Sequence, residues 1–225
     1  MCPCAARAPA AFRGNDILNR RHQPMQMSAS HSVLADQFGP AAGTARRIKQ
    51  AVLVVLGIAV LAVAANIKVP VPGSPVLMNM GTFAVLTIGA AYGARLGLTT
   101  IMGYMIIGAL GFDIFQSSTA ELNGIEYMMG STGGYLVGYV MATVLLGALA
   151  QRGWDRSMVW MAVAMLIGNI VLYVPGLLWL GQLYGWDQPI LAWGLTPFLL
   201  GDALKLLLAA ILLPLVWKLV GDARR

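Results

Sequence analysis

One stretch near the end of the chain determines how the rest must fold: residues 196–205 read TPFLLGDALK and continue into an apolar segment that ends near residue 220. Thr196 is a candidate N-cap and Pro197 stands at the first helical position, so a helix is expected to begin here. About twenty mostly apolar residues follow, which is enough to cross a bilayer. Asp202 and Lys205 interrupt them at a spacing of i,i+3, which places both on one helical face.

This pair of charges lies at membrane depth. At 1.5 Å per residue, Lys205 is roughly 12 Å past Pro197 and roughly 20 Å before Lys218. Each charge would cost about 2.5–3.5 kcal/mol at the centre of a lipid-facing helix, so something must compensate both. Two interpretations are open. The pair can be a structural element that neutralises itself, or it can be a ligand site, which we favour because ionisable residues inside membranes are usually functional.

The composition agrees with a membrane protein. Of the 225 residues, 58% are hydrophobic and only 11% are charged, whereas a soluble domain carries about 25% charged residues. We therefore predict an all-α integral membrane protein embedded in the lipid bilayer. The formal charge of +6 is concentrated in the N-terminal segment and at the ends of spans, as membrane orientation requires, so no nucleic-acid partner is expected. No GxxxxGK[ST] loop occurs, which excludes ATP binding of that type by this chain.

Few residues are candidates for disulfides or metal ligands. Cys2 and Cys4 lie too near the start of the chain to form a disulfide framework. Together with His22 and His31 they do not match the usual spacing of a zinc site. We expect no metal and no cofactor.

Reading outward from the C-terminal helix, we predict three regions. Residues 1–47 form a flexible cytoplasmic arm, residues 48–221 form a membrane domain of six helices, and residues 222–225 form a basic cytoplasmic tail. Met27 is a plausible second start, so residues 1–26 are expected to be dispensable. The spans are expected at 49–67, at two short helices within 81–112, at a segment that opens with residues 130–135 and runs to about 150, at 157–180 and at 197–220.

The segment 81–112 must be divided, because one helix of that length would measure close to 50 Å against a hydrocarbon core of about 30 Å. The break is expected at GARLG, residues 93–97, which would place Arg95 in a tight turn. Before this segment, the prolines of residues 70–75 forbid regular helix and must be covered by protein or line a cavity.

The distribution of basic residues predicts the orientation. Thirteen of the fifteen Lys and Arg residues fall on the N-terminal segment through Lys49, on the turns at 93–97 and 151–156, or at the C-terminus. By the positive-inside rule both termini are cytoplasmic, and the chain is expected in the cell inner (plasma) membrane. The Asp202–Lys205 pair then lies in the outer half of the membrane, below an acidic loop at 113–129 that can fold over a pocket.

Five candidate ligand-binding residues lie at or near the outward ends of their predicted spans: Asn79, Thr132, Tyr135, Asp202 and Lys205. They offer a cation, a carboxylate, amides and hydroxyls, which suit a small ligand with a carboxylate and an amide-like polar head. Lys205 would meet the carboxylate, while Asp202 or Asn79 would accept hydrogen bonds from N–H donors. Asn169 can equally serve as a hydrogen-bonding contact between helices. The candidates are Asn79, Asn123, Thr132, Tyr135, Asn169, Asp202 and Lys205.

These motifs resemble one known family. The proline segment, GFDIF at 111–115, STGGY at 131–135 and PFLLGDALK at 197–205 are similar, in order and spacing, to the BioY family, the biotin-specific S components of energy-coupling-factor (ECF) transporters. The resemblance runs from about Ala51 to Val220. It implies an S-component bundle of six helices, high-affinity capture of biotin near the outer face, and coupling to a transmembrane subunit and ATPase subunits. By motif position it assigns ligand contacts to Asp202, Lys205 and Tyr135.

Several alternatives stay open. Ala62-x-x-x-Asn66 stands where the resemblance implies two small docking residues, so uptake without a dedicated energising module, alone or as a homo-oligomer, is one of them. Another is an S component for lipoate, thiamine or riboflavin, and a passive channel is a third. An intramembrane enzyme is disfavoured, because Ser131 and Ser157 have no histidine within a span to act as base. We expect no enzymatic activity.

Overall fold

The computed structural model describes residues 32–40, 42–69, 78–116 and 123–222. The chain divides into two compact units, residues 1–30 and residues 31–225, and the first lies outside the described residues. The proline segment of residues 70–75 and the acidic Glu121 also lie outside them. Everything below concerns the second unit.

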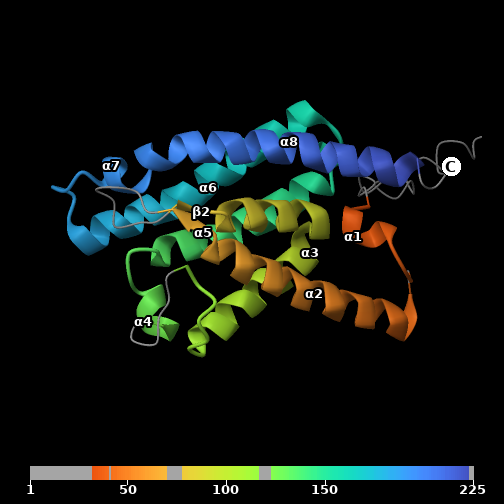
Figure 1. Ribbon diagram of the computed structural model, residues 1–225, viewed down its shortest axis with the longest axis horizontal. Helices are drawn as coiled ribbons and strands as arrows, with labels where there is room; N and C mark the ends of the chain where they lie inside the picture. Colours follow the sequence, from red (N-terminus) through yellow and green to blue (C-terminus); the bar gives the residue numbers. More distant parts are fainter. Residues whose placement is uncertain (1–31, 41, 70–77, 117–122, 223–225) are drawn as a thin grey trace, which may run out of the picture. The chain divides into compact units, whose positions relative to one another are not determined.

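The secondary structure in the described part of the second unit consists of helices and one short pair of strands (Figure 1). Strands β1 (Lys68–Val69) and β2 (Met78–Asn79) pair antiparallel, with Lys68 opposite Asn79. Short helical turns connect the long helices. In chain order the helices are α1 (Leu34–Gln37), α2 (Gly43–Asn66), α3 (Gly81–Ala109), α4 (Gly124–Met128), α5 (Gly133–Ala150), η2 (Trp154–Arg156), α6 (Met158–Tyr184), α7 (Ile190–Gly194), η3 (Thr196–Phe198) and α8 (Leu199–Asp222).

Within the described residues, five helical segments are long and apolar enough to cross a membrane: α2, α3, α5, α6 and the segment Ile190–Gly221 that contains α8. Their outward faces carry large exposed aliphatic side chains, such as Val55 (66% exposed) on α2 and Leu200 (76% exposed) on α8. Side chains of this kind are stable in hydrocarbon rather than in water. The prediction of an all-helical membrane protein is confirmed at this level.

Helix α3 is broken in its middle, where the sequence predicted it. Gly93 has φ +78° and ψ 171°, a backbone conformation that favours glycine. The chain turns sharply there, because a Cβ on Gly97 would lie only 3.5 Å from Cα of Gly89, whereas eight residues of straight helix span about 12 Å. Figure 1 shows the two halves diverging from this bend. The break falls at the first residue of the expected stretch, so Arg95 is helical rather than part of the turn.

Helix α5 is central, with α3 on one side and α6 on the other, while α2 packs on α3 and α8 packs on α6. Close approach of the backbones makes this packing possible. A Cβ on Gly138 would lie 2.5 Å from the carbonyl oxygen of Leu172, and Ala142 is fully buried. The small residues of α5 therefore serve helix packing, which in a membrane depends on such contacts.

The prediction of a flexible arm over residues 1–47 is wrong for its described part. Residues 34–37 form α1, and α2 begins at Gly43. Val33 and Leu34 are 3% and 8% exposed and belong to the main hydrophobic cluster. The side chain of Val33 packs at the bend of α3, within 3.3 Å of where a Cβ on Gly93 would lie. Burial of these two adjacent apolar residues anchors the segment. The prediction missed them because it rested on the polar average composition of residues 1–47.

Two boundaries near the C-terminus also differ from expectation. Helix α6 continues to Tyr184 instead of ending at Leu180. Thr196 is not the N-cap of the last helix, because it lies inside η3 and its hydroxyl donates to the carbonyl of Leu191 at 3.1 Å. Helix α8 then begins at Leu199, two residues later than the sequence suggested.

Candidate ligand-binding site

A cavity of about 590 Å³, counting its open mouth, lies where β2, α3, α4, α5, α6 and α8 meet. Most of its lining is aromatic, with a group of polar side chains among the rings. The rings are Tyr104, Phe115, Tyr127, Tyr135, Tyr139, Tyr173 and Phe198, and the polar side chains are Asn79, Thr82, Gln116, Thr132, Asp202 and Lys205.

The Asp202–Lys205 ion pair lies in the cavity wall and is buried, at 6% and 9% exposure. Nζ of Lys205 lies 2.9 Å from Oδ1 of Asp202 and donates to Oγ1 of Thr82, also at 2.9 Å. The hydroxyl of Tyr173 donates to the other carboxylate oxygen, Oδ2. Helices α3, α6 and α8 thus hold the pair in place together, and the two charges neutralise each other.

The pair still has hydrogen-bonding capacity for a ligand. An ammonium group carries three N–H donors, and the contacts with Asp202 and Thr82 engage two of them. Each carboxylate oxygen offers about two acceptor sites, of which the described contacts use one on each oxygen. A bound polar group can therefore add to this network without dismantling it.

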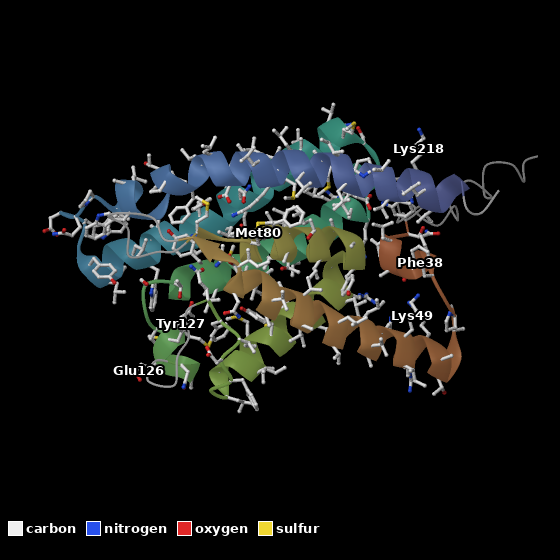
Figure 2. All side chains as sticks on the ribbon, viewed as in Figure 1. Phe38, Lys49, Met80, Glu126, Tyr127 and Lys218 are labelled. Atoms are coloured by element: carbon white, nitrogen blue, oxygen red, sulfur yellow. The ribbon has the colours of Figure 1, made fainter. Side chains whose placement is uncertain are left out.

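A second polar group joins β2 to the loop before α4. Oδ1 of Asn79 accepts from the backbone N–H of Gly81 at 2.6 Å, and Nδ2 of Asn79 donates to Oε1 of Gln116. The hydroxyl of Tyr127 donates to the backbone carbonyl of Gln116 at 2.5 Å. Burial raises the pKa of Tyr127, so this hydroxyl keeps its proton and remains a donor. Figure 2 labels Tyr127 beside Glu126 on α4, which borders the cavity.

Phe115 covers one side of the cavity and is 1% exposed. Its ring stacks on Tyr127 with centroids 5.1 Å apart and meets Tyr104 edge-on at 5.3 Å. A Cβ on Gly108 would lie 2.0 Å from this ring, so only glycine leaves room for it. The described part of the loop that follows α3, residues 111–116, therefore contributes Phe115 and Gln116 to the cavity lining, and the prediction that the loop 113–129 folds over a pocket extends to residues outside the described part.

The opposite wall is built by Tyr135 and Tyr173, whose rings meet edge-on with centroids 6.0 Å apart. The hydroxyl of Tyr135 donates to the carbonyl of Gly194 in α7 at 2.8 Å. Tyr135 thus ties the cavity wall to the connection between α6 and α8, and its ring is one of the aromatics that line the cavity.

Comparisons with known proteins agree with this architecture. A family model described as the BioY family matches residues 31–222. The chain belongs to the BioY family. A "Probable biotin transporter BioY" of Pyrococcus horikoshii is 32% identical over 166 residues, covering 74% of this chain and 94% of that protein. The "Biotin transporter BioY" of Thermotoga maritima is 25% identical over 160 residues, covering 71% and 92%.

The fold has a solved counterpart as well. It is a crystal structure of the "S-component for biotin from an ECF-type ABC transporter", with a TM-score of 0.68 and 18% identity, covering 79% of this chain and 95% of that one. The likeness shows that this BioY family member has the S-component fold. The resemblance drawn from the sequence motifs is confirmed.

In this BioY family member, most of the site residues expected from the sequence converge on one cavity. Asn79, Thr132, Tyr135, Asp202 and Lys205 all line it, and their contact with a ligand stays a prediction. They come from β2, the start of α5, and α8, which are far apart in the chain.

Two expected residues lie elsewhere. Asn123 precedes α4, and its backbone carbonyl accepts from the N–H of Tyr127 at 3.2 Å. Asn169 lines a separate, mostly apolar groove between α6 and α8, into which Asp202 also extends. Asn169 lies near the middle of α6, and the phase of that helix directs it to the other groove.

Sequence reasoning missed the polar partners Thr82 and Gln116 and the aromatic residues Tyr104, Tyr139, Tyr173 and Phe198. A signal existed for Thr82, which stands in the first helical turn after Asn79. No three His, Cys, Asp or Glu side chains gather into a metal-binding group among the described residues. The chemistry that the described groups offer is hydrogen bonding and stacking around an ion pair.

Proposed function

We propose that this chain takes up biotin, by capturing it with high affinity from the outer side of the membrane in the cavity around Asp202 and Lys205. The observation that carries this proposal is the buried Asp202–Lys205–Tyr173 network in the wall of an aromatic cavity, in a chain of the BioY family. A network of this kind is costly to bury, so its position beside an open cavity argues for ligand binding rather than for packing alone.

Biotin matches the chemistry of the lining. Its ureido ring is planar and offers two N–H donors and a carbonyl acceptor, and its other end is a carboxylate on an apolar chain. Asp202 and Asn79 supply acceptors for the N–H groups, while Lys205 supplies the charge for a carboxylate. The seven aromatic rings surround the apolar middle, where stacking and burial stabilise the complex.

The proposed topology has six spans, counted by dividing α3 at Gly93 into segments 81–92 and 94–109. These two segments are about 18 and 24 Å long, and each is shorter than the hydrocarbon core of about 30 Å. The bend between them would therefore lie close to one membrane surface. The described basic residues at the ends of helices support cytoplasmic termini in the inner membrane. The cavity then opens toward the outside.

For energy coupling, we propose that the chain acts with a transmembrane subunit and ATPase subunits of the ECF type, as a substrate-binding component rather than an enzyme. Support comes from the S-component fold. Operation without dedicated partners, alone or as a homo-oligomer, is the alternative.

Competition binding on the purified chain tests the proposed substrate. Labelled biotin should bind at one site per chain, and unlabelled biotin should displace it, whereas lipoate, thiamine and riboflavin should not. Mass spectrometry of protein purified from biotin-fed cells should find biotin bound. If lipoate displaced the label at concentrations similar to those of biotin, the site would instead recognise only a carboxylate on an apolar chain. Failure of biotin to bind would contradict the proposal.

A further inference from the structure

We propose that a second site, at the opposite end of α8, binds the headgroup of an anionic phospholipid. It is a groove of about 860 Å³, counting its open mouth, between the segment that carries α1, the turn η2 and the last turns of α8. Arg156 from η2 and Lys218 from α8 both line it and are exposed. Two cations from different elements thus face one depression.

Arg156 is held in place by its neighbours. Its Nη2 donates to the backbone carbonyl of Ser32 at 3.2 Å, and its guanidinium lies 4.4 Å from the centroid of the Trp217 ring. The buried carboxylate of Asp155 accepts from Nε1 of Trp217 at 2.5 Å and so orients that ring. A guanidinium stacked on an aromatic ring and tied to a carbonyl is preorganised, which lowers the entropic cost of binding an anion.

The groove itself carries positive charge. Among the described residues that line it, none is acidic. The nearby Asp155 is 1% exposed and lies under Trp217 rather than in the lining. Among the described residues, no atom would lie within 4 Å of a Cβ on Gly221, so their side chains leave the groove open at the end of α8. A phosphate can therefore reach both cations.

Aromatic side chains place this groove at the membrane–water interface. Trp217 lines it, and Trp154 and Trp160 form a ring pair, 4.8 Å apart, on the adjoining η2 and the start of α6. Tryptophans concentrate at the headgroup level, and basic pockets between helices at that level attract anionic lipids. Exposed Leu215 and Leu219 on α8 leave an apolar surface beside the groove for an acyl chain. A lipid therefore fits better than a free phosphate.

This site is distant from the cavity. Lys218 follows Lys205 by thirteen residues on one helix, which corresponds to about 20 Å. A variant at Lys218 should leave ligand binding in the cavity unchanged, so a failure of this proposal can be distinguished from a failure of the proposed function.

The test uses the full chain purified in neutral detergent and titrated with dioctanoyl phosphatidylglycerol, dioctanoyl phosphatidylcholine or inorganic phosphate. Binding is measured by native mass spectrometry and by the shift in Tm. Phosphatidylglycerol should bind and raise the Tm, while the zwitterionic lipid and inorganic phosphate should not. Lys218→Gln should weaken phosphatidylglycerol binding about fivefold, the value of one basic residue near a membrane surface.

Lys49→Gln is the matched control, because it removes the same charge from α2, outside the groove; Figure 2 labels both lysines. Gly221→Glu is a second variant that adds a carboxylate where no described residue would clash with its Cβ, and it should abolish binding. If Lys218→Gln and Lys49→Gln weakened phosphatidylglycerol binding equally, the proposal would be overturned. That result would indicate non-specific attraction by all the basic residues on this side of the membrane. Equal binding of the two lipids, or a matching Tm shift with inorganic phosphate, would also overturn it.

Discussion

Replacing Lys205 with methionine separates a ligand-binding role of the ion pair from a purely structural one. The substitution keeps the length of the side chain but removes its charge and its hydrogen bonds to Asp202 and Thr82, both at 2.9 Å. Losing a charge-assisted contact in a dry pocket costs about 1.5–3 kcal/mol, so biotin affinity should fall roughly ten- to a hundredfold.

The same change should also destabilise the fold. Asp202, at 6% exposure, would keep the hydrogen bond from Tyr173 but lose its cation, and breaking a buried pair typically costs about 3–5 kcal/mol. The double variant Lys205→Met/Asp202→Leu removes both charges and should recover much of that stability, because no unpaired charge remains. Biotin affinity should stay low in the double variant.

Isothermal titration with biotin and with its carboxamide distinguishes the two roles. The wild-type chain should bind the amide poorly, whereas Lys205→Met should discriminate little between acid and amide. Thr82→Val is the matched control: it removes the neutral partner of Nζ but keeps the charge, so the preference for the acid should persist. If Lys205→Met keeps the wild-type preference for the free acid and only melts earlier, Lys205 does not meet the carboxylate.

Three further predictions concern the rest of the chain. With both native cysteines removed, a cysteine at Asp187 should react with an impermeant maleimide in intact cells and one at Arg152 should not, and the reverse pattern would contradict the proposed topology. A chain that begins at Met27 should insert and take up biotin normally, since the preceding residues show no apolar periodicity in their sequence; loss of binding would reveal a role for them. Val33→Ala should lower the free energy of unfolding in a detergent titration by about 1–3 kcal/mol, because this side chain is 3% exposed against the bend of α3, whereas Val52→Ala on the lipid-facing surface of α2 should change it little.

Much of the fold and part of the site could be predicted from local patterns. Long apolar runs identified the membrane helices, because only a helix satisfies its own backbone in hydrocarbon. The break of α3 could be predicted because the segment is too long for one span and glycine marks the bend at Gly93. Asp202 and Lys205 could be recognised as a candidate site because charged residues inside a membrane-spanning helix are rare and usually functional. Each of these signals is contained in a few neighbouring residues.

What the sequence by itself determined was therefore the class of protein, the position of its helices and the pair of charges on α8. The tertiary structure alone decided which side chains meet that pair. Tyr173 and Thr82 reach it from other helices, and the rotation of each helix about its axis, set by close packing of small residues, brings them inward. That rotation turned Asn169 into a different groove, and packing at the bend of α3 buried Val33 in a segment that looked like a mobile arm. Helical phase and long-range packing depend on all the neighbouring helices at once, so no local stretch of sequence encodes them.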